Sequence, residues 1–152
     1  MISYGKEILT DSLLDEMVPL LEAHYNEIAW KKDKIKLSIN RGKYLGMQDM
    51  GIVKTFTARD SGQLIGYAVF FISTHMHYKE TKFATNDVVY LEPSKRGRGS
   101  GALLLEVAER HLVNWGCEVI NLHVKNCLNW GPLAEKLGYE PVEQTWSKWV
   151  GE

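Results

Sequence analysis

The chain has 152 residues, of which 45% are hydrophobic and 24% charged, and its formal net charge is −1 at pH 7. This length supports one sizeable core, so we expect residues 1–152 to form a single domain. The near-zero charge gives no basic surface for nucleic acid or for a membrane, and the longest apolar run, Leu64–Ile72, is too short to span a bilayer. The two cysteines have no metal or redox spacing and the N-terminus has no signal-peptide core, which favours a reduced, cytoplasmic protein.

The first part of the chain predicts a strand and then a helix. Residues 2–9 are expected to form the strand, and Thr10 or Asp11 is suited to cap the helix that follows. That helix carries leucines, a methionine and His24 on one stripe, which is typical of a face packed on a sheet. Pro19 interrupts the pattern and predicts either a kink or a later start.

The middle of the chain predicts a second helix and a pair of strands. Residues 33–46 form the weaker second helix, and Ile52–Ala58 alternates as a strand. Leu64–Ser73 is nearly all apolar, which indicates a strand buried on both faces at the middle of a sheet. We expect residues 74–83 to be a polar connection.

The last part of the chain predicts strands and helices in alternation. We expect a strand, a helix, a strand and a short helix over residues 84–91, 99–114, 119–124 and 130–137. The first three form a crossover unit with parallel strands. The tail, 141–150, is expected to add one or two short strands.

The turn between the strand 84–91 and the helix 99–114 contains three glycines and two arginines between Arg96 and Gly101. Unpaired amides and the macrodipole at a helix N-terminus favour an anion, and glycine lets the backbone approach it closely. The segment therefore predicts a site for the pyrophosphate of a cofactor. It lacks the Gly-Lys-Ser/Thr of a Walker loop and the spacing of a dinucleotide-binding fingerprint, and the remaining alternative is a glycine-rich connector without a ligand.

Two motifs carry a resemblance to a known family. Arg96-x-x-Gly99-x-Gly101, preceded by Leu91-x-Pro93, resembles the coenzyme A pyrophosphate loop of the GNAT superfamily of N-acetyltransferases. Residues 135–139, Glu-Lys-Leu-Gly-Tyr, are similar to the ending of that family's fourth helix. The order of elements agrees too, and the details also resemble small acetyltransferase-like proteins encoded by bacteriophages. The resemblance implies the α/β (α+β) GNAT acyl-CoA N-acyltransferase fold, a mixed central sheet of about six to seven strands flanked by about four helices.

The resemblance further implies an activity and a cofactor site. Acetyl-CoA would donate an acetyl group to a primary amine of a small molecule or protein, by direct attack in a ternary complex. Val89, Tyr90 and Leu91 would bind the pantetheine arm where the fourth and fifth strands splay apart, and an amide near Leu91 would polarise the thioester. The family's pantetheine-binding asparagine falls on Cys127, beside Asn126, which we assign to the cofactor site. The pyrophosphate is assigned to Arg96, Gly97, Arg98, Gly99, Ser100 and Gly101.

An amine that is protonated at pH 7 needs a base before it can attack. Asp87 is the first candidate, because strict alternation would place it on the same face as Leu91 and burial would raise its pKa. Glu92, at the end of the same strand, is the second candidate. The alternative for Asp87 is a polar residue that only begins the strand, and for Glu92 a solvated acid before a proline.

The acceptor side is predicted from the first helix and from the connection before the fourth strand. His24 and Glu27 form an i, i+3 pair on that helix, and His77 and Tyr78 lie in the connection, so we assign all four to acceptor binding. The His-x-His pattern has no acid or cysteine cluster near it, so we predict no metal. The identity of the amine is not encoded in any motif.

One departure from the family concerns the departing thiolate. Many members carry a tyrosine four residues before the glycine of the fourth-helix ending, and here that position is Ala134. The alternative function is therefore a non-catalytic CoA-binding module that acts through a protein partner. The protein is expected to be a monomer or a homodimer, and the aromatic segment Trp146–Val150 offers an edge for a second chain.

Overall fold

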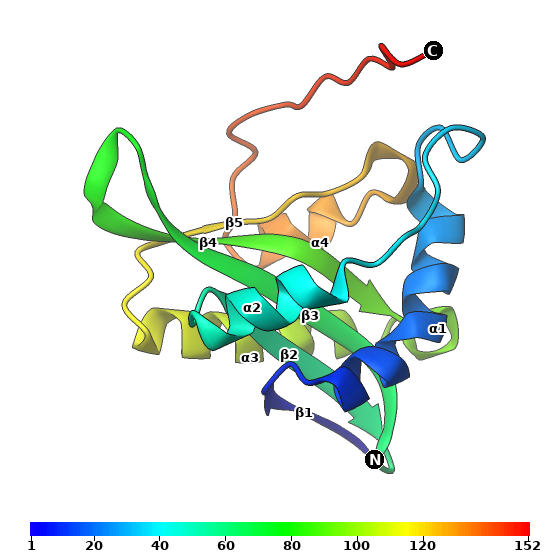
Figure 1. Ribbon diagram of the computed structural model, residues 1–152. Helices are drawn as coiled ribbons and strands as arrows, with labels where there is room; N and C mark the ends of the chain where they lie inside the picture. The colour runs from blue at the N-terminus through cyan, green and yellow to red at the C-terminus, as the bar shows by residue number, and fades with distance from the viewer.

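The computed structural model describes residues 1–152 and contains one five-stranded sheet in the order β1-β2-β3-β4-β5 (Figure 1). The strands are β1 (Ile2–Glu7), β2 (Val53–Asp60), β3 (Gln63–His75), β4 (Tyr78–Leu91) and β5 (Val119–Asn121). The helices are α1 (Asp11–Ile28), α2 (Arg41–Asp49), α3 (Ser100–Asn114) and α4 (Gly131–Lys136), with 3-10 turns η1 (Pro93–Lys95) and η2 (Asn126–Leu128). All neighbouring strands are antiparallel except β4 and β5, which are parallel.

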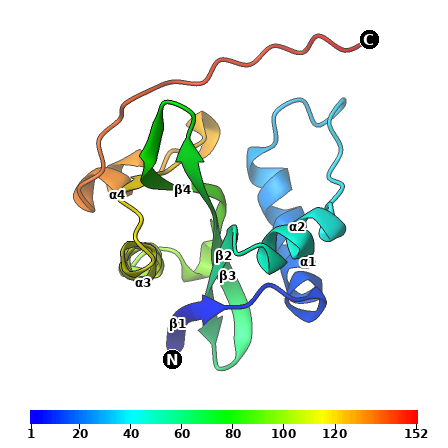
Figure 2. The same ribbon diagram turned by 60° about the vertical axis from the view of Figure 1, so that its left-hand side comes forward.

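The helices cover both faces of the sheet: α1 and α2 lie on one side, and α3 and α4 on the other (Figure 2). Each side has its own core, one built around Leu104, Ala108 and Leu112 of α3 and the other around Leu14 and Met17 of α1. β3 contributes to both cores, which confirms that its apolar run is a central strand buried on both faces. No helix combines the length and apolar character needed to cross a bilayer.

α1 is one uninterrupted helix of 18 residues. Thr10 caps it, because its hydroxyl accepts a hydrogen bond from the Leu13 amide at 3.2 Å. Pro19 lies within the helix on an exposed position, and the helix continues past it to Ile28. The expected start is therefore confirmed and no late start occurs.

The second helix was wrongly placed at 33–46, since α2 spans Arg41–Asp49 and Gly46 lies within it. The start is set by Asn40, whose side-chain oxygen accepts a hydrogen bond from the Lys43 amide at 3.1 Å. The end is set by Gly51, which has a positive φ of 73°. The sequence signal for this helix start is weak, because it consists of one asparagine cap before a helix that has no buried residue.

The expected polar connection at 74–83 is also wrong, because these residues complete a long β3–β4 hairpin. Ser73 pairs with Phe83, Thr74 with Lys82, and His75 with Tyr78. The aromatic rings at the tip stabilise the pairing, with the His75 ring centroid 4.9 Å from that of Tyr78 and 5.8 Å from that of Phe83.

The sheet has five strands instead of the expected six to seven, since the tail 141–150 forms none. β5 is also shorter than expected and covers only Val119–Asn121. Strand formation depends on a pairing partner, and no other strand of the chain lies beside the tail.

Candidate active site

The site begins where β4 loses a neighbour. β5 pairs only with Phe83–Thr85, so the rest of this edge of β4 has no strand beside it. On the other edge, the Glu92 amide donates to the Ile65 carbonyl at 2.9 Å. Because backbone groups alternate in direction along an antiparallel strand, the N–H and C=O groups of Val89 and Leu91 point to the open edge.

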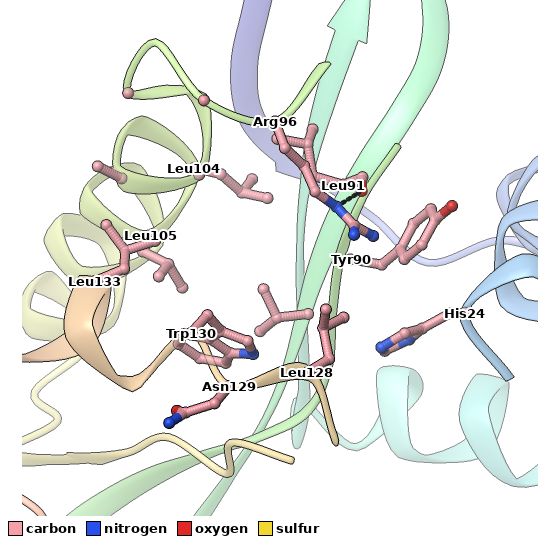
Figure 3. Close-up of a pocket in the computed structure, with 15 residues that line it drawn as sticks. His24, Tyr90, Leu91, Arg96, Leu104, Leu105, Leu128, Asn129, Trp130 and Leu133 are labelled. Atoms are coloured by element: carbon pink, nitrogen blue, oxygen red, sulfur yellow. Dashed lines mark hydrogen bonds between the residues drawn. The ribbon is translucent and has the colours of Figure 1, made fainter. Parts of the chain in front are cut away.

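A cavity of about 290 Å³ lies at this open edge. Figure 3 shows its walls: β4 on one side, α3 and the glycine-rich loop on another, and the segment from η2 to α4 opposite. His24 of α1 reaches in from the far side of β4. The lining residues are His24, Val89, Tyr90, Leu91, Arg96, Gly97, Gly99, Gly101, Ala102, Leu104, Leu105, Leu128, Asn129, Trp130 and Leu133.

The glycine-rich loop presents unbonded amides to the cavity. Gly97, Arg98 and Gly99 have φ of 86°, 51° and 80°, a left-handed run that the two glycines adopt without strain and that is uncommon for an arginine. Gly99 caps α3 without a side chain, and the amides of Gly101 and Ala102 make no hydrogen bond within the chain. The dipole of the 15-residue helix adds to these donors, so an anion is favoured here.

Arg96 fixes this loop to two other elements. Its Nε donates to the Leu91 carbonyl at 2.8 Å, and its two terminal nitrogens donate to the Glu27 carboxylate at 2.9 and 2.7 Å. The guanidinium also lies 5.6 Å from the centroid of the Tyr90 ring. Arg96 lines the cavity, and its hydrogen bonds hold the loop against α1 and β4; its assignment to the pyrophosphate stays a prediction.

Arg98 differs from Arg96 because its guanidinium is exposed and makes no hydrogen bond or ion pair within the chain. It lies between the two left-handed glycines, beside the unbonded amides. Of the two arginines in the loop, Arg98 is the one whose charge is available to a phosphate.

His24 is half-buried and lines the cavity from α1. Its ring centroid lies 5.1 Å from that of Tyr90. Burial lowers the pKa of the imidazole below its usual value, with a further lowering from the Arg96 charge, while Glu27 raises it in part. The ring is therefore neutral at pH 7 and has a nitrogen lone pair available for a proton.

Asp87 lies outside the cavity, at a β-bulge. Val88 pairs with Val69 and Asn86 with Phe70, so Asp87 is the unpaired extra residue in β4. The bulge turns its side chain towards α2, where the Tyr44 hydroxyl donates to the carboxylate.

The expectation that Asp87 and Leu91 share a face is therefore wrong, because Leu91 belongs to the core on the α3 side. The bulge breaks the alternation on which that expectation rested. Partial desolvation still raises the pKa of Asp87, against the lowering effect of the Tyr44 hydrogen bond.

The other residues assigned from sequence are only partly brought together. Glu92 is half-buried at the start of η1, and its carboxylate makes no hydrogen bond within the chain. His77 and Tyr78 lie at the tip of the β3–β4 hairpin, at the opposite end of β4 from the loop, and neither lines the cavity. Ser100 is buried at the start of α3.

Asn126 is exposed in η2 and does not line the cavity, whereas Asn129 does. The Asn129 side-chain oxygen accepts from the Gly131 amide at 2.8 Å, which holds the side chain at the cavity wall. Trp130 and Leu133 complete this wall. The sequence shows that Trp130 and Leu133 are apolar and lie at the start of a helix. No local sequence pattern shows that their side chains face a cavity and not the core.

The resemblance places a tyrosine at position 134, where this chain has alanine, and neither Tyr139 nor Tyr78 lines the cavity in its place. Ala134 is buried in α4 at 7% exposure. The Tyr139 hydroxyl donates to Glu109 at 3.0 Å, and burial raises its pKa well above the usual value, so it packs α4 against α3. Tyr78 lies at the distant hairpin tip.

Comparison with known proteins agrees with this geometry. The profile of the acetyltransferase (GNAT) family matches residues 14–139. A GCN5-related N-acetyltransferase from Ralstonia eutropha superposes with a TM-score of 0.80 at 18% identity, covering 99% of this chain and 100% of that one. A "predicted acetyltransferase with acetyl-CoA" from Clostridium acetobutylicum gives 0.70 at 16% identity, over 99% and 97% of the two chains.

A ribosomal-protein-alanine N-acetyltransferase from Brucella melitensis is similar as well, with a TM-score of 0.70 at 16% identity over 100% of this chain and 99% of that one. No curated protein matches the sequence. At these identities the solved structures show the fold, which confirms the fold inferred from the loop and from the order of the elements.

Proposed function

The chain belongs to the acetyltransferase (GNAT) family, and from this we propose that it transfers an acetyl group from acetyl-CoA to a primary amine of a small molecule or protein, by direct attack in a ternary complex. The observation that carries the proposal is the coincidence of three features around one cavity. The open edge of β4 and the unbonded amides of the loop line the cavity, and the third feature, the unpaired charge of Arg98, belongs to the same loop without lining the cavity.

The residues present fit coenzyme A. Arg98 and the amides of Gly97, Gly99 and Gly101 would hold the pyrophosphate, because these amides donate no hydrogen bond within the chain. The glycines have no side chain that would keep the phosphate away from the backbone. The open edge offers the N–H and C=O groups of Val89 and the N–H of Leu91 to an amide-containing arm, while the Leu91 carbonyl already accepts from Arg96. Asn129 would add a side-chain amide from the opposite wall.

Acetyl-CoA, when bound, would supply the activated acetyl thioester. The Leu91 N–H, held at the open edge of β4, provides a fixed donor for the negative charge that develops during transfer. The cavity walls hold the reacting groups together and exclude water, which supplies rate through proximity.

We assign the general base to His24. It lines the cavity and is neutral at pH 7, so it can accept the proton that the amine loses. Asp87 lies on the opposite face of β4 from Leu91. The two residues are also four positions apart along the strand, which separates their backbones by about 13 Å. Asp87 and Glu92, the two candidates proposed from the sequence, are kept as alternatives to His24, and mutation of each residue separates them.

The leaving thiolate needs little help from the chain. A thiol has a pKa of about 8.5, so its anion is an adequate leaving group and solvent can protonate it. This accounts for how Ala134 is compatible with turnover. The same residue is what favours the second candidate function, a CoA-binding module without catalysis.

The test is isothermal titration with acetyl-CoA and desulfo-CoA, with ATP and NAD as controls, followed by a thiol-release assay with a panel of amines. Binding of both CoA compounds and thiol release with one class of amine are expected. Binding without thiol release from any amine would favour the non-catalytic module. Failure to bind either CoA compound would overturn both candidates and leave the loop as a structural connector.

A further inference from the structure

The C-terminal segment, residues 140–152, is extended and makes no hydrogen bond to the rest of its own chain. Its large apolar side chains are open to solvent, with Val142 77%, Trp146 88% and Val150 85% exposed. Figures 1 and 2 show the segment leading away from the body of the molecule. Tryptophan and valine are common in strands, and exposed apolar side chains often mark a contact surface. The segment therefore has the features of a strand that lacks a neighbouring strand.

The sheet has a matching vacancy at its edge. β5 is the last strand, paired with β4 on one side and with nothing on the other. Ile120 and Leu122 pack only partly against the core on the α3 side and stay half-buried. Unpaired backbone groups on such an edge form a template for another strand.

We propose that the C-terminal segment of one copy of this chain pairs with the β5 edge of a second copy, and that the second copy returns the same contact. An antiparallel register with Lys148 opposite Glu118 brings opposite charges together. The same register places Trp146 opposite Ile120, so that the exposed ring covers the half-buried side chain.

A second copy is favoured over the segment's own β5 by the way the segment leaves the domain. The Tyr139 amide donates to the Ala134 carbonyl and the Tyr139 hydroxyl to Glu109, both at 3.0 Å, which fixes the root of the segment on α4 and α3. Pro141 keeps Glu140 extended, so the chain continues outward instead of reversing.

The exchanged surface is counted twice, because each copy both gives and receives the segment. Trp146 is exposed in each copy whereas Trp149 is half-buried, and a buried tryptophan contributes about 150–250 Å². The two copies of Trp146 therefore supply roughly 300–500 Å², and the backbone, Val142 and Val150 of both copies supply the rest of the about 1,200–2,000 Å² of a typical specific interface.

The mass in solution tests the contact first. Size exclusion with light scattering should give about twice the 17.4 kDa of one chain for the full-length protein, and one chain mass after deletion of residues 141–152. The thermal unfolding of the deleted monomer should stay cooperative, because the segment makes no hydrogen bond to its own domain. A full-length monomer, or a dimer that survives the deletion, would overturn the proposal.

A cysteine pair then separates exchange from self-pairing. The register places Asn121 opposite Thr145, so Asn121→Cys and Thr145→Cys are introduced in a Cys127→Ser background, while the buried Cys117 is retained. The two single variants, coexpressed as separate chains, should form a disulfide-linked heterodimer. A disulfide that forms only within one chain carrying both cysteines would show self-pairing and refute the exchange.

Discussion

The Arg96 guanidinium and the Glu27 carboxylate are joined by two parallel hydrogen bonds of 2.9 and 2.7 Å, between residues 69 positions apart in sequence. The pair joins the glycine-rich loop to α1, the helix that also carries His24. Both side chains are largely shielded, at 33% and 25% exposure, so the pair is more than a solvated surface contact. One interaction thus fixes the glycine-rich loop of the cavity relative to α1, which contributes His24 to the same cavity.

The first prediction concerns the stability that this pair provides. Arg96 lowers the pKa of Glu27 chiefly through the hydrogen bonds, so the folded protein favours the ionised carboxylate. Glu27→Gln should therefore lower the free energy of unfolding by about 1 kcal/mol at pH 7, and the difference should shrink as the pH falls below about 4.5. Urea titrations at both pH values check this. Glu22→Gln, on an exposed position of the same helix, is the control, and an equal loss in both variants would contradict the prediction.

The second prediction separates the two arginines of the loop. Arg98→Ala should weaken CoA binding about tenfold at low salt, because one charge-assisted contact to a phosphate contributes about 1.5 kcal/mol or more. The loss should diminish at high salt, since screening weakens an exposed contact. Titrations at two ionic strengths measure it.

Arg110→Ala is the matched control for Arg98, since Arg110 is also exposed but lies in the second half of α3 (Ser100–Asn114), away from the glycine-rich loop at the start of that helix. Its removal changes the net charge equally but should leave CoA affinity unchanged. If the two variants lose affinity to the same extent, the effect is a general one of charge and Arg98 does not contact a phosphate.

The third prediction concerns Gly66, which pairs with Leu91 at the end of β4. A Cβ at Gly66 would lie 2.6 Å from the Tyr90 carbonyl oxygen and 3.0 Å from the Leu91 Cα, both of them backbone atoms. Gly66→Ala should therefore lower the free energy of unfolding by about 1–3 kcal/mol and displace the strand that forms the cavity wall.

Gly5→Ala is the control for Gly66→Ala, because Gly5 also lies in a strand but a Cβ there meets nothing within 4 Å. Thermal unfolding of the two variants side by side measures the difference. A Gly66→Ala protein as stable as the Gly5→Ala protein would contradict the prediction, because it would show that β3 and β4 accommodate the added Cβ with no loss in the free energy of unfolding.

The features that could be predicted from the sequence depend on neighbouring residues. The loop from Arg96 to Gly101 was identified because its glycines and the helix start are contiguous. α1 and α3 followed from the spacing of their buried leucines, and the apolar run in β3 indicated a central strand. These signals need no knowledge of what lies across the sheet.

The features that were missed depend on partners distant in sequence. The bulge at Asp87 arises from the register between β3 and β4, and one extra residue reverses which face a side chain occupies. The contact of Arg96 with Glu27 joins the loop to a helix 69 positions away in sequence. The hairpin at 74–83 is polar in sequence but is stabilised by rings that meet only after the strands pair.

The last prediction concerns the base. His24 should give kcat/KM an acidic limb, so that activity rises with pH as the imidazole loses its proton. Because burial lowers the pKa of His24, the midpoint should lie below the usual value of about 6.5. His24→Gln should remove this limb and reduce kcat/KM by about 10²- to 10⁴-fold, with CoA affinity retained. Thiol release across pH 5–9 and titration with CoA measure the two effects. Retained activity in His24→Gln, with a loss of that size in Asp87→Asn or Glu92→Gln, would assign the base to that carboxylate instead.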